Sequence, residues 1–135
     1  MELFHINRRR FLQGATASLA LGAYGASGLD LIYPDKPYRV GLIGTGWYGK
    51  SDLFRLIQVV PVEVVALCDV DKNLLNAAAD LVSKRQKSGK RPQLYGDYRK
   101  MLAEHQMDLV LIGTPDHWHA LQCIDAVKAG AHVYV

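Results

Sequence analysis

The chain has 135 residues, of which 50% are apolar and 21% are charged, and this composition is that of a globular protein rather than a disordered one. Its length is enough for one ordinary domain and too short for two. The formal charge is only +3 at pH 7, and the run Arg8-Arg9-Arg10 alone supplies three positive charges. The rest is close to neutral, which excludes the basic footprint of a nucleic-acid-binding domain.

The first 30 residues differ in character from the rest. A basic run is followed by an Ala- and Gly-rich stretch that has no charge before Asp30 and is short for a membrane span. The stretch resembles a twin-arginine export signal, whose core of two arginines, any residue, then Phe-Leu is carried here by Arg8, Arg9, Phe11 and Leu12. Asn7 departs from the usual Ser or Thr. The alternative is an amphipathic or core helix, which the four glycines between residues 14 and 28 would weaken.

Residues 1–30 are therefore expected to direct export by the twin-arginine machinery, which would be a partner of the chain. The protein would be periplasmic, or membrane-anchored and facing the periplasm. Residues 31–37, with Pro34 and Pro37, are expected to form a linker.

From Tyr38 onward, short apolar runs alternate with helical stripes. In chain order we predict a strand at 38–43, a helix at 48–60, a strand at 62–68, a helix at 71–86, a strand at 93–95, a helix from 97 to 105, a strand at 108–112, a helix at 118–129 and a strand at 132–135. A basic stretch at 84–91 reads as a solvated turn. This alternation predicts an α/β fold, with a doubly wound parallel sheet of about five strands.

A glycine-rich motif, Gly44-Thr45-Gly46-Trp47-Tyr48-Gly49, follows the first predicted strand and opens a helix. In a Rossmann-like fold, the first glycine permits the tight turn and the second lets the backbone approach a pyrophosphate. The third lets the helix pack closely on the strand. The unpaired N–H groups of the helix N-terminus favour the phosphates. The motif alone is weak, because a glycine-rich turn can be purely structural.

Asp69 strengthens the interpretation, because it ends the second strand 20 residues after Gly49. A carboxylate there can accept hydrogen bonds from an adenosine ribose and would repel a 2′-phosphate. The sequence therefore predicts NAD as the cofactor in preference to NADP, although Lys72 could soften that preference. The alternative is an ordinary surface aspartate.

The segment Gly113-Thr114-Pro115-Asp116-His117-Trp118-His119-Ala120 follows the fourth strand. It resembles the signature of the Gfo/Idh/MocA family of glucose–fructose oxidoreductases and inositol dehydrogenases, and the glycine motif and Asp69 are similar to that family's first unit. The resemblance covers residues 38–135, the expected NAD(P)-binding Rossmann domain. It implies a pyrophosphate site at Gly44, Thr45, Gly46, Trp47 and Tyr48, an adenosine ribose site at Asp69, and a nicotinamide ribose site at Thr114, Pro115 and His119.

His117 and His119 have two interpretations, a polar helix-capping loop or a direct catalytic role, and His119 is the only catalytic candidate we retain. No metal site is expected, because an HxH pair without a third ligand is not a coordination set. Trp118 is either a packing residue or a substrate platform. Cys68 and Cys123 lack ligand spacing and are expected to be small apolar residues of the interior, although a disulfide or a reactive thiol is the alternative.

The ending Gly130-Ala131-His132-Val133-Tyr134-Val135 resembles the strand that leads into the family's Glu-Lys-Pro motif. The resemblance implies that the catalytic lysine, the substrate domain and the oligomer interface would follow Val135, so this chain would be a fragment that lacks the catalytic lysine. The expected function is hydride transfer between nicotinamide and a sugar- or polyol-type hydroxyl by an exported, homo-oligomeric parent. The alternatives are a non-catalytic NAD-binding module and one half of a split enzyme.

Overall fold

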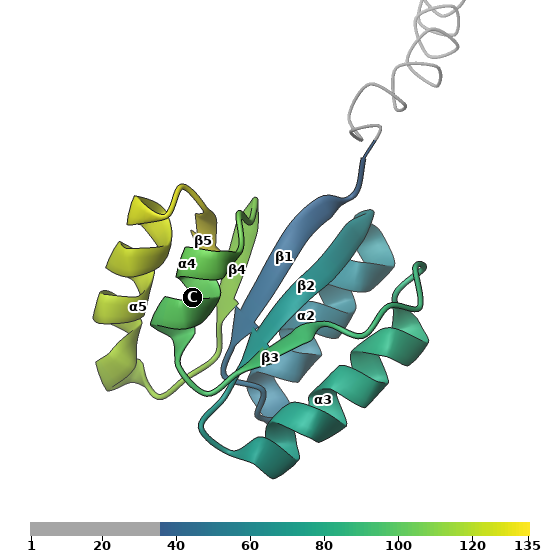
Figure 1. The fold of residues 1–135 in the computed structure, drawn as a ribbon, viewed down its shortest axis with the longest axis horizontal. Coiled ribbons are helices and arrows are strands. Elements are labelled where there is room, and N and C mark those ends of the chain that lie inside the picture. The colour runs from purple at the N-terminus through teal and green to yellow at the C-terminus, as the bar shows by residue number, and fades with distance from the viewer. Residues whose placement is uncertain (1–35) are drawn as a thin grey trace, which may run out of the picture. The chain divides into compact units, whose positions relative to one another are not determined.

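A computed structural model describes residues 36–135 (Figure 1). The expected export signal at residues 1–30 and most of the expected linker lie outside the described residues. Within the described part, strands and helices alternate in this order: β1 Tyr38–Ile43, α2 Trp47–Val59, β2 Val62–Cys68, α3 Lys72–Arg85, β3 Gln93–Tyr95, α4 Tyr98–Glu104, β4 Leu109–Ile112, α5 Asp116–Lys128 and β5 His132–Tyr134.

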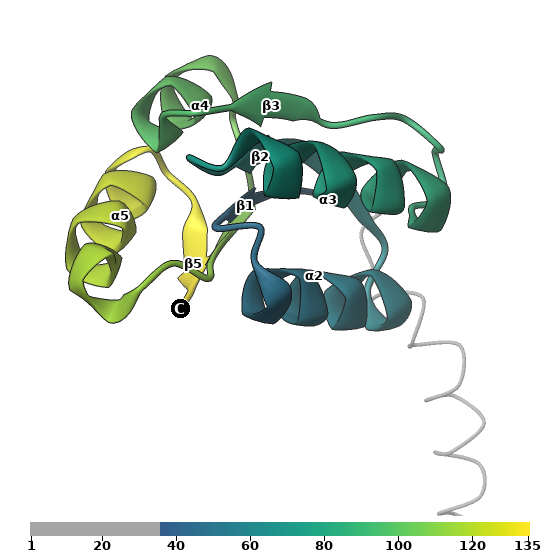
Figure 2. The same cartoon turned by 90° about the horizontal axis from the view of Figure 1, so that it is seen from below.

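The five strands form one parallel sheet in the order β3-β2-β1-β4-β5. The helices that follow β1 and β2 cover one face of this sheet, and the helices that follow β3 and β4 cover the other (Figure 2). The winding direction reverses between β1 and β4. The predicted doubly wound α/β fold is confirmed, and the reversal marks the sheet edge at which such folds bind ligands.

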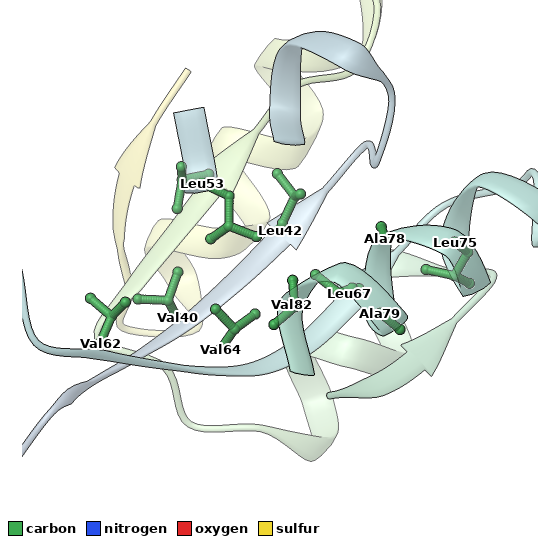
Figure 3. Packing of buried hydrophobic residues seen from close by; sticks show 11 residues of the cluster. Val40, Leu42, Leu53, Val62, Val64, Leu67, Leu75, Ala78, Ala79 and Val82 are labelled. Atoms are coloured by element: carbon green, nitrogen blue, oxygen red, sulfur yellow. The ribbon is translucent and has the colours of Figure 1, made fainter. Parts of the chain in front are cut away.

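The larger apolar cluster lies between the sheet and helices α2 and α3 (Figure 3). Val40 and Leu42 of β1 project toward Leu53 of α2, and all three are fully buried. The α3 face that packs there carries small and branched residues, because a helix lying close to a sheet leaves little room for long side chains: Leu75, Ala78, Ala79 and Val82.

A β-bulge in β2 changes which side chains face each layer. The register between β1 and β2 slips by one residue after Val40, so that Val40 pairs with Val64 and the next residue with Ala66. The extra residue reverses the alternation. Leu67 therefore joins the α2 and α3 cluster, and Cys68 turns to the opposite face with α4 and α5.

The predicted element boundaries hold to within one or two residues. Asp71 and Asp97 cap α3 and α4, where their carboxylates accept backbone N–H groups of the first turn. Helix α5 begins two residues earlier than predicted, at Asp116, because Pro115 has φ −59° and leads directly into the helix.

Both cysteines are free, with Cys68 buried and Cys123 half-buried. Within residues 36–135, no helix is both long and apolar enough to cross a bilayer.

Candidate functional site

The glycine motif forms the turn between β1 and α2. Gly44 has φ +91°, a left-handed conformation that side chains rarely tolerate, and an added Cβ would lie 2.7 Å from the carbonyl carbon of Gly113. A Cβ on Gly49 would overlap the carbonyl oxygen of Gly44. These contacts pack the first turn of α2 directly against the ends of β1 and β4.

Gly46 differs from the other two glycines of the motif. Its φ of −62° is open to any residue, and an added Cβ would meet no described atom within 4 Å. Gly46 is the N-cap of α2, makes no side-chain cap, and is followed by a first turn without acidic residues. The N–H groups of this helix end are therefore available to an anion, and glycine here leaves space in front of them.

Asp69 follows β2 directly and lies beside the glycine motif. One carboxylate oxygen, Oδ2, accepts both the Thr45 N–H at 2.6 Å and the Thr45 hydroxyl at 2.8 Å. The other oxygen, Oδ1, accepts the N–H of Asp71 at 2.9 Å. The structure thus places Thr45, which is fully buried, against Asp69 rather than on the surface of the site.

A pocket of about 570 Å³ opens at this edge of the sheet. Its lining comes from the ends of β1 and β2, the loops that follow β1 to β4, the start of α4, and Trp118 and Gln122 of α5. Five of the predicted site residues are in this lining: Gly44, Gly46, Asp69, Thr114 and Pro115. The other five, Thr45, Trp47, Tyr48, Gly49 and His119, are outside it.

Trp47 and Tyr48 lie in the first turn of α2 and are 80% and 59% exposed. Their rings form a tilted pair with centroids 6.4 Å apart.

The loop after β4 is held by two polar side chains of α5. The Thr114 hydroxyl donates to the Gln122 side-chain oxygen at 2.6 Å, and Gln122 is itself buried. The ring Nε2 of His119 lies 2.6 Å from the Thr114 carbonyl oxygen, and because a carbonyl only accepts, Nε2 is the protonated nitrogen in this contact. His119 therefore fixes the backbone of the pocket wall, whereas His117 is exposed beside Trp118.

A family described as "Oxidoreductase family, NAD-binding Rossmann fold", the Gfo/Idh/MocA family, matches residues 38–135. The chain belongs to this family. A protein from Shewanella baltica named "Glycosyl hydrolase family 109 protein" is 33% identical over an alignment of 156 positions. The alignment covers 98% of this chain and 34% of that protein.

Solved dehydrogenase structures share the fold. Myo-inositol 2-dehydrogenase from Lactobacillus plantarum has a TM-score of 0.63 at 28% identity, over 73% of this chain and 27% of that one. The WlbA dehydrogenase from Chromobacterium violaceum, solved with NADH and UDP-GlcNAcA, has a TM-score of 0.61 at 27% identity, over the same shares. The chain spans about a third of the length of the curated relatives it matches.

The geometry fits the cofactor of the Gfo/Idh/MocA family, and this chain is an NAD-binding Rossmann domain. The open space at Gly46 and the uncapped N-terminus of α2 suit a pyrophosphate, and Asp69 presents a carboxylate in the pocket lining. When bound, NAD supplies a nicotinamide ring that accepts a hydride.

Sequence reasoning missed the part of the site that follows β3. Tyr98 and Arg99, at the start of α4, line the pocket. The Tyr98 hydroxyl donates to Asp125 of α5 at 2.9 Å, and the Arg99 guanidinium carbon lies 4.5 Å from the centre of the Tyr98 ring. No local motif marks these residues, but their place directly after a parallel strand is the signal that could have found them.

Cys68 forms part of the pocket wall at the end of β2. Burial raises the pKa of its thiol to about 12, and the carboxylates of Asp69 and Asp97 add to the rise. The thiol is therefore protonated at neutral pH and is no nucleophile here.

Proposed function

We propose that this chain is the NAD-binding part of an exported oxidoreductase that transfers a hydride between nicotinamide and a sugar- or polyol-type hydroxyl. The observation that carries the proposal is Asp69, a carboxylate in a pocket at the switch point of a doubly wound sheet, beside the open helix end at Gly46. The likeness to myo-inositol 2-dehydrogenase supports a polyol as the hydroxyl compound.

The residues of the pocket have distinct roles in this proposal. The backbone around Gly46 holds the pyrophosphate, and Asp69 accepts a hydroxyl of the adenosine ribose. Thr114 and Pro115 lie at the nicotinamide ribose, while His119 positions the Thr114 carbonyl. We assign no catalytic residue within the chain, since none of these groups is a free base.

Calorimetric titration of the full chain with NAD, and separately with NADP, tests the cofactor site. We expect saturable NAD binding that weakens at least about tenfold in Asp69→Ala, because the variant loses a hydrogen bond between the ribose and a charged acceptor, worth roughly 1.5–3 kcal/mol. Asp71→Asn is the matched control, since it keeps an oxygen to cap α3 and should bind NAD as the wild type does. Equal NAD affinity in wild type and Asp69→Ala would contradict the ribose assignment.

A second candidate reaction is the cleavage of a glycoside, which the 33% identity to the Shewanella baltica glycosyl hydrolase family 109 protein favours. The two reactions differ in the fate of the cofactor. Oxidation of a polyol accumulates NADH in proportion to product, whereas a hydrolysis leaves the total NAD unchanged. Incubation of the protein purified from its own source with polyols, and with chromogenic glycosides, while NADH absorbance is followed, separates them.

The export part of the proposal rests on the sequence pattern at Arg8 and Arg9. Replacement of both by lysine in a reporter fusion should abolish translocation, because twin-arginine signals are read as a motif rather than as a charge. Replacement of Arg10, which the motif leaves free, by lysine is the control and should leave translocation intact. Export that survives the double replacement would contradict the proposed route.

A further inference from the structure

Thr45 lies outside the pocket lining but contacts Asp69, which is part of it. Thr45 sits in the middle of the glycine motif with none of its surface exposed, and yet both of its donors point to one oxygen of Asp69. The strands bring the two together, because Ile43 pairs with Cys68 and the Gly44 N–H donates to the Cys68 carbonyl at 2.8 Å. Asp69 follows Cys68 and Thr45 follows Gly44, so the two residues lie next to each other just beyond the ends of β2 and β1.

The protein already fills most of the acceptor positions of the Asp69 carboxylate. A carboxylate has about four lone-pair sites on its two oxygens. The donors from Thr45 occupy both sites of Oδ2, and the N–H of Asp71 occupies one site of Oδ1. One acceptor site on Oδ1 is left for a ligand, and its direction is set by the other three bonds.

The chemistry of Thr45 suits a fixed contact. Its β-branched side chain is restricted at χ1, and its complete burial restricts it further. Without the hydroxyl, the carboxylate would keep one backbone N–H on each oxygen, from Thr45 and from Asp71, and the hydroxyl adds a second donor on Oδ2 that narrows the remaining rotation about the Cβ–Cγ bond. Within the described part of the chain, no ion pair joins Asp69 to a cation, so these hydrogen bonds are what orients it.

We propose that the Thr45 hydroxyl is a positioning group that locks the Asp69 carboxylate toward the adenosine ribose, and so sets the preference for NAD over NADP. The inference rests on the proposed role of Asp69 in cofactor binding. With the carboxylate locked, its free acceptor site and its negative charge stay where the ribose 2′ position binds. Without the hydroxyl, the carboxylate is held only by two backbone N–H groups and its orientation is looser, which weakens the bond to a ribose hydroxyl and lets the charge move away from a 2′-phosphate.

The test compares the dissociation constants for NAD and NADP in the full chain and in two variants of Thr45. Thr45→Val keeps the branched shape and the backbone N–H but removes the hydroxyl, and Thr45→Ser keeps the hydroxyl. We expect Thr45→Val to weaken NAD by about 3- to 10-fold, the range of one hydrogen bond, while NADP binding stays level or tightens. The ratio of the two constants should return to within about twofold of the wild-type value in Thr45→Ser, which carries the same donor.

A purely structural role would weaken both dinucleotides by the same factor, and that result would overturn the inference. If Thr45→Val does not fold, Thr45→Ala removes the same hydroxyl without its methyl groups and decides by the same ratio. In an Asp69→Ala background, Thr45→Val should leave the ratio unchanged, since there is no carboxylate to position, and a further shift would also refute the inference. A wild-type chain that binds neither dinucleotide would instead refute the proposed function, and would reduce the Thr45–Asp69 contact to a structural one.

Discussion

Two alanine substitutions in the same turn should separate the structural glycine from the ligand-binding one. At Gly46, an added methyl group meets no described atom within 4 Å, and the backbone has an ordinary φ of −62°. At Gly49, the same methyl overlaps the backbone oxygen of Gly44, which no side-chain movement can relieve. The two variants add the same atom three residues apart.

The expected costs to folding differ severalfold. Alanine is a poorer N-cap than glycine by roughly 0.5–1 kcal/mol, and the reduced entropy of the unfolded chain returns about 0.4–1 kcal/mol, so Gly46→Ala should be within about 1 kcal/mol of the wild type. Gly49→Ala must push α2 away from the sheet and should cost about 3 kcal/mol or more, a large share of the roughly 5–15 kcal/mol that holds a domain folded.

Urea denaturation and NAD titration of both variants provide the test. Gly46→Ala should unfold near the wild-type midpoint, yet bind NAD about tenfold more weakly or worse, because its methyl group fills the space in front of the α2 N-terminus. Gly49→Ala should show a clearly lower midpoint. The reasoning is refuted if Gly46→Ala binds NAD with wild-type affinity, or if it unfolds as early as Gly49→Ala does.

Three further predictions concern the surroundings of the site. Gln86→Leu should destabilise the fold by about 1–3 kcal/mol in urea denaturation, because buried Gln86 accepts a backbone N–H of β2 at 2.9 Å and the leucine would leave that group unpaired. Burial and the hydrogen bond to Glu104 raise the pKa of Tyr95 from 10.0 to about 12. The stability that the protonated Tyr95 hydroxyl contributes is therefore complete below pH 10 and is lost as the pH rises to 12. Tyr95→Phe should flatten the curve of unfolding free energy against pH in this range, and an unchanged slope would contradict the prediction. At pH 8, iodoacetamide should alkylate Cys123 well before Cys68, whose thiol is buried and whose pKa is near 12, as peptide mass mapping would show.

Much of the fold could be predicted because each element depends on local pattern. The run Val62–Cys68 is apolar enough to specify a buried strand, and Asp71 and Asp97 are caps that local sequence alone makes plain. The predicted start of α5 was two residues late for a local reason too. A proline such as Pro115 occurs both immediately before a helix and within a loop. The location of the binding site at the carboxyl ends of the strands could be predicted from the parallel topology alone.

The contacts that complete the site depend on register, which no local pattern specifies. The bulge in β2, opposite Val40 and Gly41, turns the Cys68 side chain toward the pocket. Without the bulge, Cys68 would face α2 and α3 on the other side of the sheet. Tyr98 enters the pocket only because β3 pairs with β2, and its hydroxyl is fixed by Asp125 from a distant helix. The bonds from Thr45 to Asp69 likewise join residues that lie 24 positions apart.

The close packing of α2 on the sheet, which the glycines permit, also places the N-terminus of α2 beside Asp69. The turn at Gly44 and the contact of Gly49 with it draw α2 against the sheet, and Gly113 completes the approach, since its added Cβ would lie 2.7 Å from the Gly49 Cα. A helix seated that deeply brings its N-terminus level with the ends of the strands, where Asp69 stands. The positive helix end and the negative carboxylate then border one pocket, so that a molecule with an anionic centre and a sugar hydroxyl on one side matches both. A larger residue at Gly113 would raise α2 and disturb the two halves of that match together.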